Sequence, residues 1–343
     1  MKIMKNLRTR RHGLILAGVL LLALAVYSGW WMWLAAGVRT QIDGWVAAQQ
    51  TMGRSVGYAK LAVSGYPGRL QIALTEVQAE DQPGGWQIKV PALQAQLTPW
   101  APDSLDGHVP EPVSLRLDKG VLPGRYAIRA GKNDLHLDAQ DGGRLTLSLA
   151  AVQITDAGQG DTLDIASLKA TLLRAKAPIY GSLDLEVDDL NYPDRWKNAF
   201  GQHVAHFQTR IEMSGAALPS GPDAAAVRAW SNDGGAMDIK SLDLAHGVLG
   251  LNGEGTLALD RDLQPIGAFT ARIAGIAPAI DQLITAGLVR PDDGALAKVV
   301  LGVMAVVPPG GGPKRVSLPL TLQDRKLSVG PIALIRLPQI VWD

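Results

Sequence analysis

The chain has 343 residues, of which 47% are apolar and 19% are charged, so it can form one large domain or two ordinary ones. This composition excludes a disordered chain and allows a sizeable core. Residues 1–12 hold five cations and no acid, so the remainder is acidic overall and we predict no nucleic-acid partner. The absence of cysteine excludes disulfides, thiolate nucleophiles and zinc–cysteine sites.

An uncharged apolar segment follows this basic tail and covers residues 13–38. About 20 apolar residues span a bilayer, so we predict a transmembrane signal-anchor helix with the lipid bilayer as its partner. The cations precede the segment, which keeps residues 1–12 in the cytoplasm and sends residues 39–343 across the membrane. The predicted anchor side chains are Leu14, Leu20, Leu24, Trp30, Trp31 and Trp33.

A cleaved signal peptide is the alternative, because Ala35, Ala36 and Gly37 could form a small-residue cleavage site. The apolar run is longer than a usual signal peptide, and bulky Trp residues crowd the site. The anchor is therefore favoured, and both interpretations export the rest of the chain.

Residues 39–52 continue the helix, and Gly53 ends it. Beyond Gly53 large apolar residues alternate with polar ones, as in residues 182–188, in roughly 14–16 segments separated by turn residues. Strict alternation is typical of half-buried antiparallel strands. We predict a mainly β, β-rich α+β fold with a large antiparallel sheet, curved or sandwich-like, and a few covering helices.

Helices are expected at only a few places in the exported part, with residues 308–313 as a linker before two strands that return to the same sheet. A loop is expected at residues 101–112, and a sub-boundary between domains near residue 192. The expected helices cover residues 194–207, 222–230, 278–288 and 293–307.

The excess of one-sided strands over covering helices leaves two arrangements open. Two sheets can pack together and close a dry core. Alternatively, one curved sheet leaves an apolar groove that needs a greasy ligand.

The search for catalytic chemistry gives no nucleophile–base set, and Ser64 is interpreted as a turn residue. His203, His206 and Glu212 could ligate a metal, but their spacing is undemanding. The acidic residues of segment 184–189 are typical of a solvated sheet face. We predict no catalytic, cofactor-binding or metal-binding residues and no enzymatic activity.

Scattered blocks resemble a bacterial family called domain of unknown function 2125. They include residues 53–58, 63–69, 229–235, 242–244, 253–260, 264–267, 274–275 and 327–338. The resemblance implies a single-span protein of the Gram-negative inner membrane whose body faces the periplasm, and it supplies no catalytic residues. The segment 255–275 is more remotely similar to AsmA-like envelope proteins, which resemble long grooved sheets thought to handle lipids.

These observations favour an envelope-maintenance or lipid-transport factor whose apolar sheet face binds envelope lipid. The alternative is a non-catalytic interaction or scaffold protein with a closed β core, which would bind envelope proteins. A continuous apolar groove favours the first function, and a filled core favours the second. An envelope hydrolase has the least support.

Overall fold

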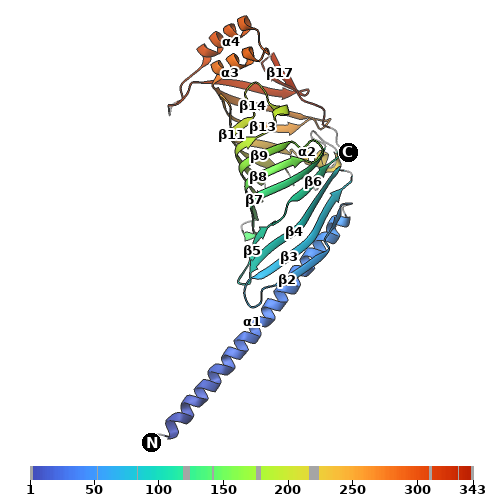
Figure 1. Cartoon of the computed structure of the whole chain (residues 1–343), viewed down its shortest axis with the longest axis vertical. Coiled ribbons are helices and arrows are strands. Elements are labelled where there is room, and N and C mark those ends of the chain that lie inside the picture. Colours follow the sequence, from blue (N-terminus) through green and yellow to red (C-terminus); the bar gives the residue numbers. More distant parts are fainter. Residues whose placement is uncertain are drawn as a thin grey trace.

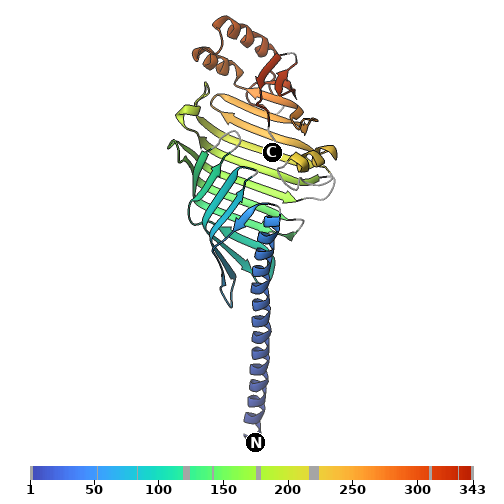
Figure 2. The same ribbon diagram turned by 90° about the vertical axis from the view of Figure 1, so that its right-hand side faces the viewer.

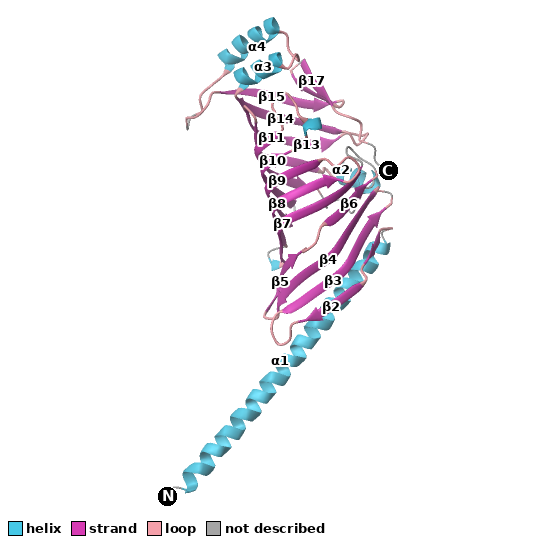
Figure 3. Ribbon diagram, viewed as in Figure 1, coloured by secondary structure: helices cyan, strands magenta, loops and turns pink. Residues whose placement is uncertain are grey.

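The computed structural model describes residues 3–51, 53–82, 84–118, 124–140, 143–174, 179–215, 224–308, 311–330 and 332–340. In these residues a long N-terminal helix leads into one twisted, curved sheet, and short helices lie at the margins of the sheet (Figures 1, 2 and 3). The described chain therefore confirms the mainly β fold class.

The helices are α1 (Ile3–Thr51), the 3-10 turn η2 (Asp194–Trp196), α2 (Ala224–Asn232), α3 (Ile276–Thr285) and α4 (Pro291–Met304). The strands of the first half are β1 (Ser55–Gly57), β2 (Lys60–Ser64), β3 (Leu70–Asp81), β4 (Trp86–Thr98), β5 (Ala101–His108), β6 (Val113–Leu117), β7 (Gly124–Asp138) and β8 (Arg144–Asp156). Those of the second half are β9 (Thr162–Arg174), β10 (Ile179–Asn191), β11 (His203–Ser214), β12 (Ala236–His246), β13 (Leu249–Leu259), β14 (Pro265–Ala274), β15 (Arg315–Gln323), β16 (Lys326–Val329) and β17 (Ile332–Arg336).

The sheet is an antiparallel meander. From β7 to β17 each strand pairs with the next strand of the chain. Between β4 and β7, the two short strands β5 and β6 pair with different halves of both neighbours. The ladder continues without interruption through β10 and β11, which flank residue 192.

Three strands contain a kink at a residue other than glycine. Glu76 in β3, Ala151 in β8 and Asp189 in β10 have φ angles of 51°, 50° and 49°. Each kink shifts the alternation by one residue, so that Leu149 and Val152 join the same apolar cluster although they are three positions apart. Such irregularities bend strands and increase twist. The kinks thus keep the apolar residues of this cluster on one side of the sheet.

Helix α1 packs on the sheet only with its C-terminal half. Its side chains are exposed from residue 16 to residue 26, whereas Trp31 is buried with Leu70 of β3 and Leu97 of β4. Residues 27, 34, 35 and 38 of the helix pack around this cluster. The helix ends where Gly53, at φ 80°, donates its backbone N–H to the Gln50 carbonyl at 3.1 Å.

Two expected elements are wrong. Residues 194–207 are not a helix, because only η2 is helical there and β11 begins at His203. The shift in the pairing of β11 with β12 between Val204 and His206 accounts for the three-residue spacing of Val204 and Phe207, whereas Trp196 and Phe200 precede the strand. Residues 101–112 are not a loop, since β5 occupies most of them.

Other expected elements are confirmed. Helices α2, α3 and α4 match three of the predicted helices, although residues 222–223 lie outside the described residues. The chain after residue 313 returns to the same sheet, where β15 pairs with β14. Of the expected linker, residues 309–310 also lie outside the described part.

Candidate functional site

One face of the sheet carries an apolar row that crosses most of its strands. Each member of the row lies opposite the next member in the register of paired strands, from β3 to β16. We call it the apolar row: Leu70, Leu97, Leu105, Leu137, Leu145, Leu172, Leu183, Ile211, Ile239, Gly255, Phe269, Leu320 and Val329.

Gly255 does not interrupt this row. A Cβ atom at Gly255 would lie 2.5 Å from Cδ1 of the Phe269 ring, so that ring covers the glycine. The apolar row is therefore continuous across thirteen strands.

The opposite face is polar at the neighbouring positions. A second row also follows the register, with no large apolar side chain between β3 and β11. Its members are Gln71, Gln96, Asp106, His136, Thr146, Thr171, Asp184 and Arg210. Each strand therefore separates an apolar face from a polar face through its alternation.

The apolar face is largely open in the described chain. All described strands belong to one sheet, so no second sheet packs on it. Only sixteen hydrophobic residues of the described chain are buried, and most of the apolar row is half-buried. Leu137 and Leu172 expose 37% and 42% of their surface. The structure thus has the curved single sheet rather than the sandwich.

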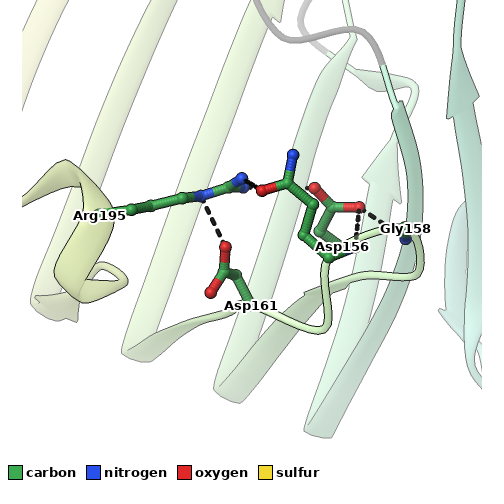
Figure 4. A network of polar contacts seen from close by, with 5 residues as sticks. Asp156, Gly158, Asp161 and Arg195 are labelled. Carbon is green, nitrogen blue, oxygen red and sulfur yellow. Dashed lines mark hydrogen bonds and ion pairs between the residues drawn. The ribbon is translucent and has the colours of Figure 1, made fainter.

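The connection between β10 and β11, residues 192–202, lies over one edge of the apolar face, where Pro193 and Trp196 line a cavity with Ile128 and Ile154, and we call it the strap. Its helical turn faces the turn that carries Asp156 and Asp161 (Figure 4). Between the strap and the sheet is an apolar cavity of about 200 Å³. Aliphatic and aromatic side chains supply most of its lining. They are Leu115, Leu117, Tyr126, Ile128, Ile154, Leu163, Pro193 and Trp196.

Arg195 holds the strap in place. Its guanidinium lies 2.6 Å from the Asp161 carboxylate and 3.3 Å from Asp156, and it donates a hydrogen bond to Gln159 (Figure 4). The backbone N–H of Gly158 lowers the pKa of Asp156 most, and Arg195 lowers it further against the effect of burial. The acids at the cavity edge are therefore paired with Arg195, and the remaining surface of the cavity is apolar.

The predicted anchor residues lie in different environments. The side chain of Leu14 falls outside the described part, while Leu20, Leu24 and Trp33 are exposed. Trp30 is exposed as well and stacks on Trp33 at a centroid distance of 5.0 Å. Trp31, in contrast, is 8% exposed and donates its indole N–H to the Gly68 carbonyl at 3.1 Å. Trp31 therefore joins the helix to the sheet.

Helix α1 carries the one described segment that is long and apolar enough to cross a membrane. The part of this helix whose side chains are described covers Leu16–Thr51, and an 18-residue stretch within it has a mean hydropathy of 1.7.

The histidines and acids considered for a metal lie on the polar face. His206 Nδ1 lies 2.7 Å from Asp188, and Glu186 completes a group of three possible ligand atoms within 4.8 Å of one another. The hydrogen bond between the His206 ring and the Asp188 carboxylate raises the pKa of His206 and lowers the pKa of Asp188. His203 pairs instead with Asp189 at 3.0 Å.

Glu212, the third candidate ligand, pairs with Lys240 at 3.2 Å rather than joining the histidines. Each of these polar groups thus has a protein partner close to it. The arrangement fits a solvated, ion-paired face.

A model of a bacterial family described as "Uncharacterized protein conserved in bacteria (DUF2125)" matches residues 31–338. The chain belongs to the DUF2125 family. The DUF2125 match begins at Trp31, the residue that α1 buries against the sheet. Neither the curated proteins nor the solved structures include a match. The remote similarity to AsmA-like envelope proteins stays a prediction.

Sequence reasoning anticipated an alternating sheet but missed the strap and the kinks. The strap was hidden because its apolar residues mimic helical spacing. The kinks had a signal in the sequence, namely a spacing of three between apolar residues inside a strand, as at Val187 and Leu190.

Proposed function

We propose that this DUF2125 protein binds the acyl chains of membrane lipids on its open apolar face, in envelope maintenance or lipid transport. One observation carries the proposal: the apolar row runs from β16 to Leu70 and Leu97, where it meets Trp31 of the apolar helix. Acyl chains suit this face because hydrocarbon needs no hydrogen-bond partners and gains from burial.

In this proposal α1 crosses the bacterial inner membrane once, with residues 1–12 in the cytoplasm and the sheet in the periplasm. The basic tail supports this orientation. The retained anchor is favoured over cleavage because a cut after Ala36 would remove Trp31 from the Leu70–Leu97 cluster.

We also propose that the protein acts by binding rather than by catalysis. The strap cavity presents aliphatic and aromatic side chains, and its charged residues are neutralised by one another. A binding surface of this kind discriminates by shape and hydrophobicity.

Site-specific photocrosslinking tests the proposal. The photoreactive residue benzoylphenylalanine replaces Leu172 on the apolar face of the full-length protein in cells. In a second variant it replaces Thr171, the preceding residue of β9, which lies on the polar face. Mass spectrometry of the purified protein should find lipid adducts at Leu172 at least tenfold above Thr171. Equal adducts at the two positions would overturn the proposal, because the label would then only report contact with bulk lipid.

A scaffold function is the second candidate, and one observation favours it. Helix α4 exposes a run of apolar side chains at the end of the sheet opposite α1, including Leu296, Val299 and Val303 (Figure 1). Such a patch suits a protein partner. Protein adducts at Val303, without lipid adducts at Leu172, would favour this function.

A further inference from the structure

The membrane-proximal tip of the sheet combines two turns with part of α1. The first turn is residues 65–69, between β2 and β3, and the second is Pro99–Trp100, between β4 and β5. Both turns lie against the same short part of the helix (Figure 1). Their height relative to the bilayer follows from the length of the apolar segment.

The part of α1 that stands clear of the sheet is too short to cross a bilayer alone. The uncharged segment begins at residue 13, and the helix first packs on the domain at Tyr27. Residues 13–26 rise about 21 Å at about 1.5 Å per residue, whereas the hydrocarbon core is about 30 Å thick. A span of about 20 residues therefore ends near Met32.

Hydrogen bonds hold the first turn at the height where this span ends. The Tyr66 and Ser28 hydroxyls are 2.7 Å apart, and Tyr27 donates to the Pro67 carbonyl. Trp31 donates to Gly68 at 3.1 Å. The turn 65–69 is therefore level with residues 27–31 of the helix.

The second turn is held in the same way, since the Trp30 indole N–H donates to the Pro99 carbonyl at 3.3 Å. Trp100, the next residue, is 74% exposed. A bilayer crossed by about 20 residues of α1 would therefore give way to its headgroups at the height of these two turns.

Four exposed aromatic side chains gather at this height, and we call them the aromatic tip: Trp30, Trp33, Tyr66 and Trp100. Two come from the helix and two from the turns of the sheet. Exposed aromatic rings are costly in water, but they are favoured at membrane interfaces, where an apolar body meets a polar edge.

We propose that the aromatic tip docks the sheet into the interface of the leaflet from which the domain emerges. Docking places Leu97 and Leu105, at the lower end of the apolar row, directly above that leaflet. The bilayer is then continuous with the apolar face. The proposal rests on membrane anchoring by α1 and does not require that the apolar face binds lipid.

Single-cysteine labelling tests the docking, because the chain has no cysteine of its own. An environment-sensitive fluorophore is attached at Trp100→Cys in the full-length protein, reconstituted into nanodiscs that contain phosphatidylcholine brominated near the headgroup. Leu24→Cys, within the predicted span, is the membrane control, and Val303→Cys, exposed on α4 at the far end, is the aqueous control.

We expect the brominated lipid to reduce the emission at Trp100→Cys at least twofold, and the emission at Val303→Cys by less than a tenth. Quenching at Trp100→Cys no greater than at Val303→Cys would overturn the docking. Absent quenching at Leu24→Cys by phosphatidylcholine brominated near the ends of its acyl chains would overturn it as well, because Leu24 lies near the middle of the span and α1 would then lie outside the bilayer.

Photocrosslinking at Leu172 keeps the two proposals distinguishable. Quenching at Trp100→Cys without lipid adducts at Leu172 supports the docking and contradicts lipid binding on the sheet. Lipid adducts at Leu172 without quenching at Trp100→Cys support lipid binding on the sheet and contradict the docking.

Discussion

The two faces of the sheet are made by the same strands but are completed in different ways. On the polar face charged groups find partners within the sheet, such as Arg210 with Asp184 at 2.5 Å and His206 with Asp188 at 2.7 Å. On the apolar face the side chains of neighbouring strands touch one another but remain half exposed. The charged groups of the polar face are paired in water, whereas the apolar face leaves hydrocarbon exposed, and this difference is the basis for proposing an apolar occupant.

In the described chain the apolar face is covered by α1 at one end and by the strap at one edge, and Ala271, Val316 and Leu322 are also buried on it, in β14 and β15. At the first, Trp31 buries Leu70 and Leu97. Near the second, Val152, Ile165 and Val187 form the other buried cluster. Between these covered parts, Leu137 and Leu172 of the apolar row remain exposed.

A charge in the covered part of the apolar face gives the largest expected effect. Val187→Asp should lower the free energy of unfolding by about 4 kcal/mol, because Val187 is 8% exposed and a carboxyl group there has no partner. Urea unfolding of the full-length protein in detergent measures it. Glu186→Gln, the adjacent residue of the polar face, should change stability by at most about 0.5 kcal/mol. Equal losses at the two positions would mean that the faces do not differ.

The contact between helix and sheet gives the next largest effect. Trp31→Ala should cost about 3 kcal/mol, because a buried indole and its hydrogen bond to Gly68 are lost. Trp33→Ala should cost less than about 1 kcal/mol, since that side chain is exposed. Thermal unfolding in detergent compares the two variants. A Trp31→Ala variant as stable as Trp33→Ala would contradict the burial of Trp31 on the sheet.

Release of the strap is expected to have a smaller effect. Arg195→Ala should cost about 1–2 kcal/mol, because it removes the charged hydrogen bonds to Asp156 and Asp161. Hydrogen exchange of residues 192–202 should accelerate in the variant. Arg210→Ala, which breaks an exposed pair on the polar face, is the control and should leave exchange in the strap unchanged.

The smallest expected effect is a pH dependence of the polar face. The Asp188 carboxylate raises the pKa of His206, so His206 stabilises the fold below about pH 6.5 and this contribution is lost as the pH rises through its folded pKa. The lowered pKa of Asp188 gives a contribution that is present above about pH 4 and lost on acidification. The pair should therefore stabilise most between these values, by less than about 1 kcal/mol because it is half exposed.

Urea unfolding of the wild-type protein and of His206→Gln across this pH range measures the contribution of the pair. The stability difference between them should shrink as the pH rises above about 6.5 through the raised pKa of His206, and as it falls below about pH 4 through the lowered pKa of Asp188. A difference that does not vary with pH would show that the pair carries no charge interaction. Gln153→Ala is the control variant, because Gln153 lies on the same face and its side chain does not titrate.

Much of the fold could be predicted where the local pattern is regular. The alternation in residues 182–188 predicted a strand with one wet face, and β10 has that form. The prediction failed at residues 194–207, because a shift of pairing and a short 3-10 turn reproduce the spacing of a helix. Likewise, the prolines in residues 101–112 suggested a loop, yet β5 is paired on both sides.

The candidate site was predictable only in part. The sequence alone determined that each strand has an apolar and a polar side and that an apolar helix precedes them, because these properties depend on the order of neighbouring residues. The tertiary structure decided which residues lie opposite one another in paired strands. It also decided whether the strands form one sheet or two packed sheets. Register joins residues far apart in the chain, such as Leu97 and Leu105 to Leu137. The open face, its contact with α1 through Trp31 and the strap over its edge therefore exist only in the folded protein.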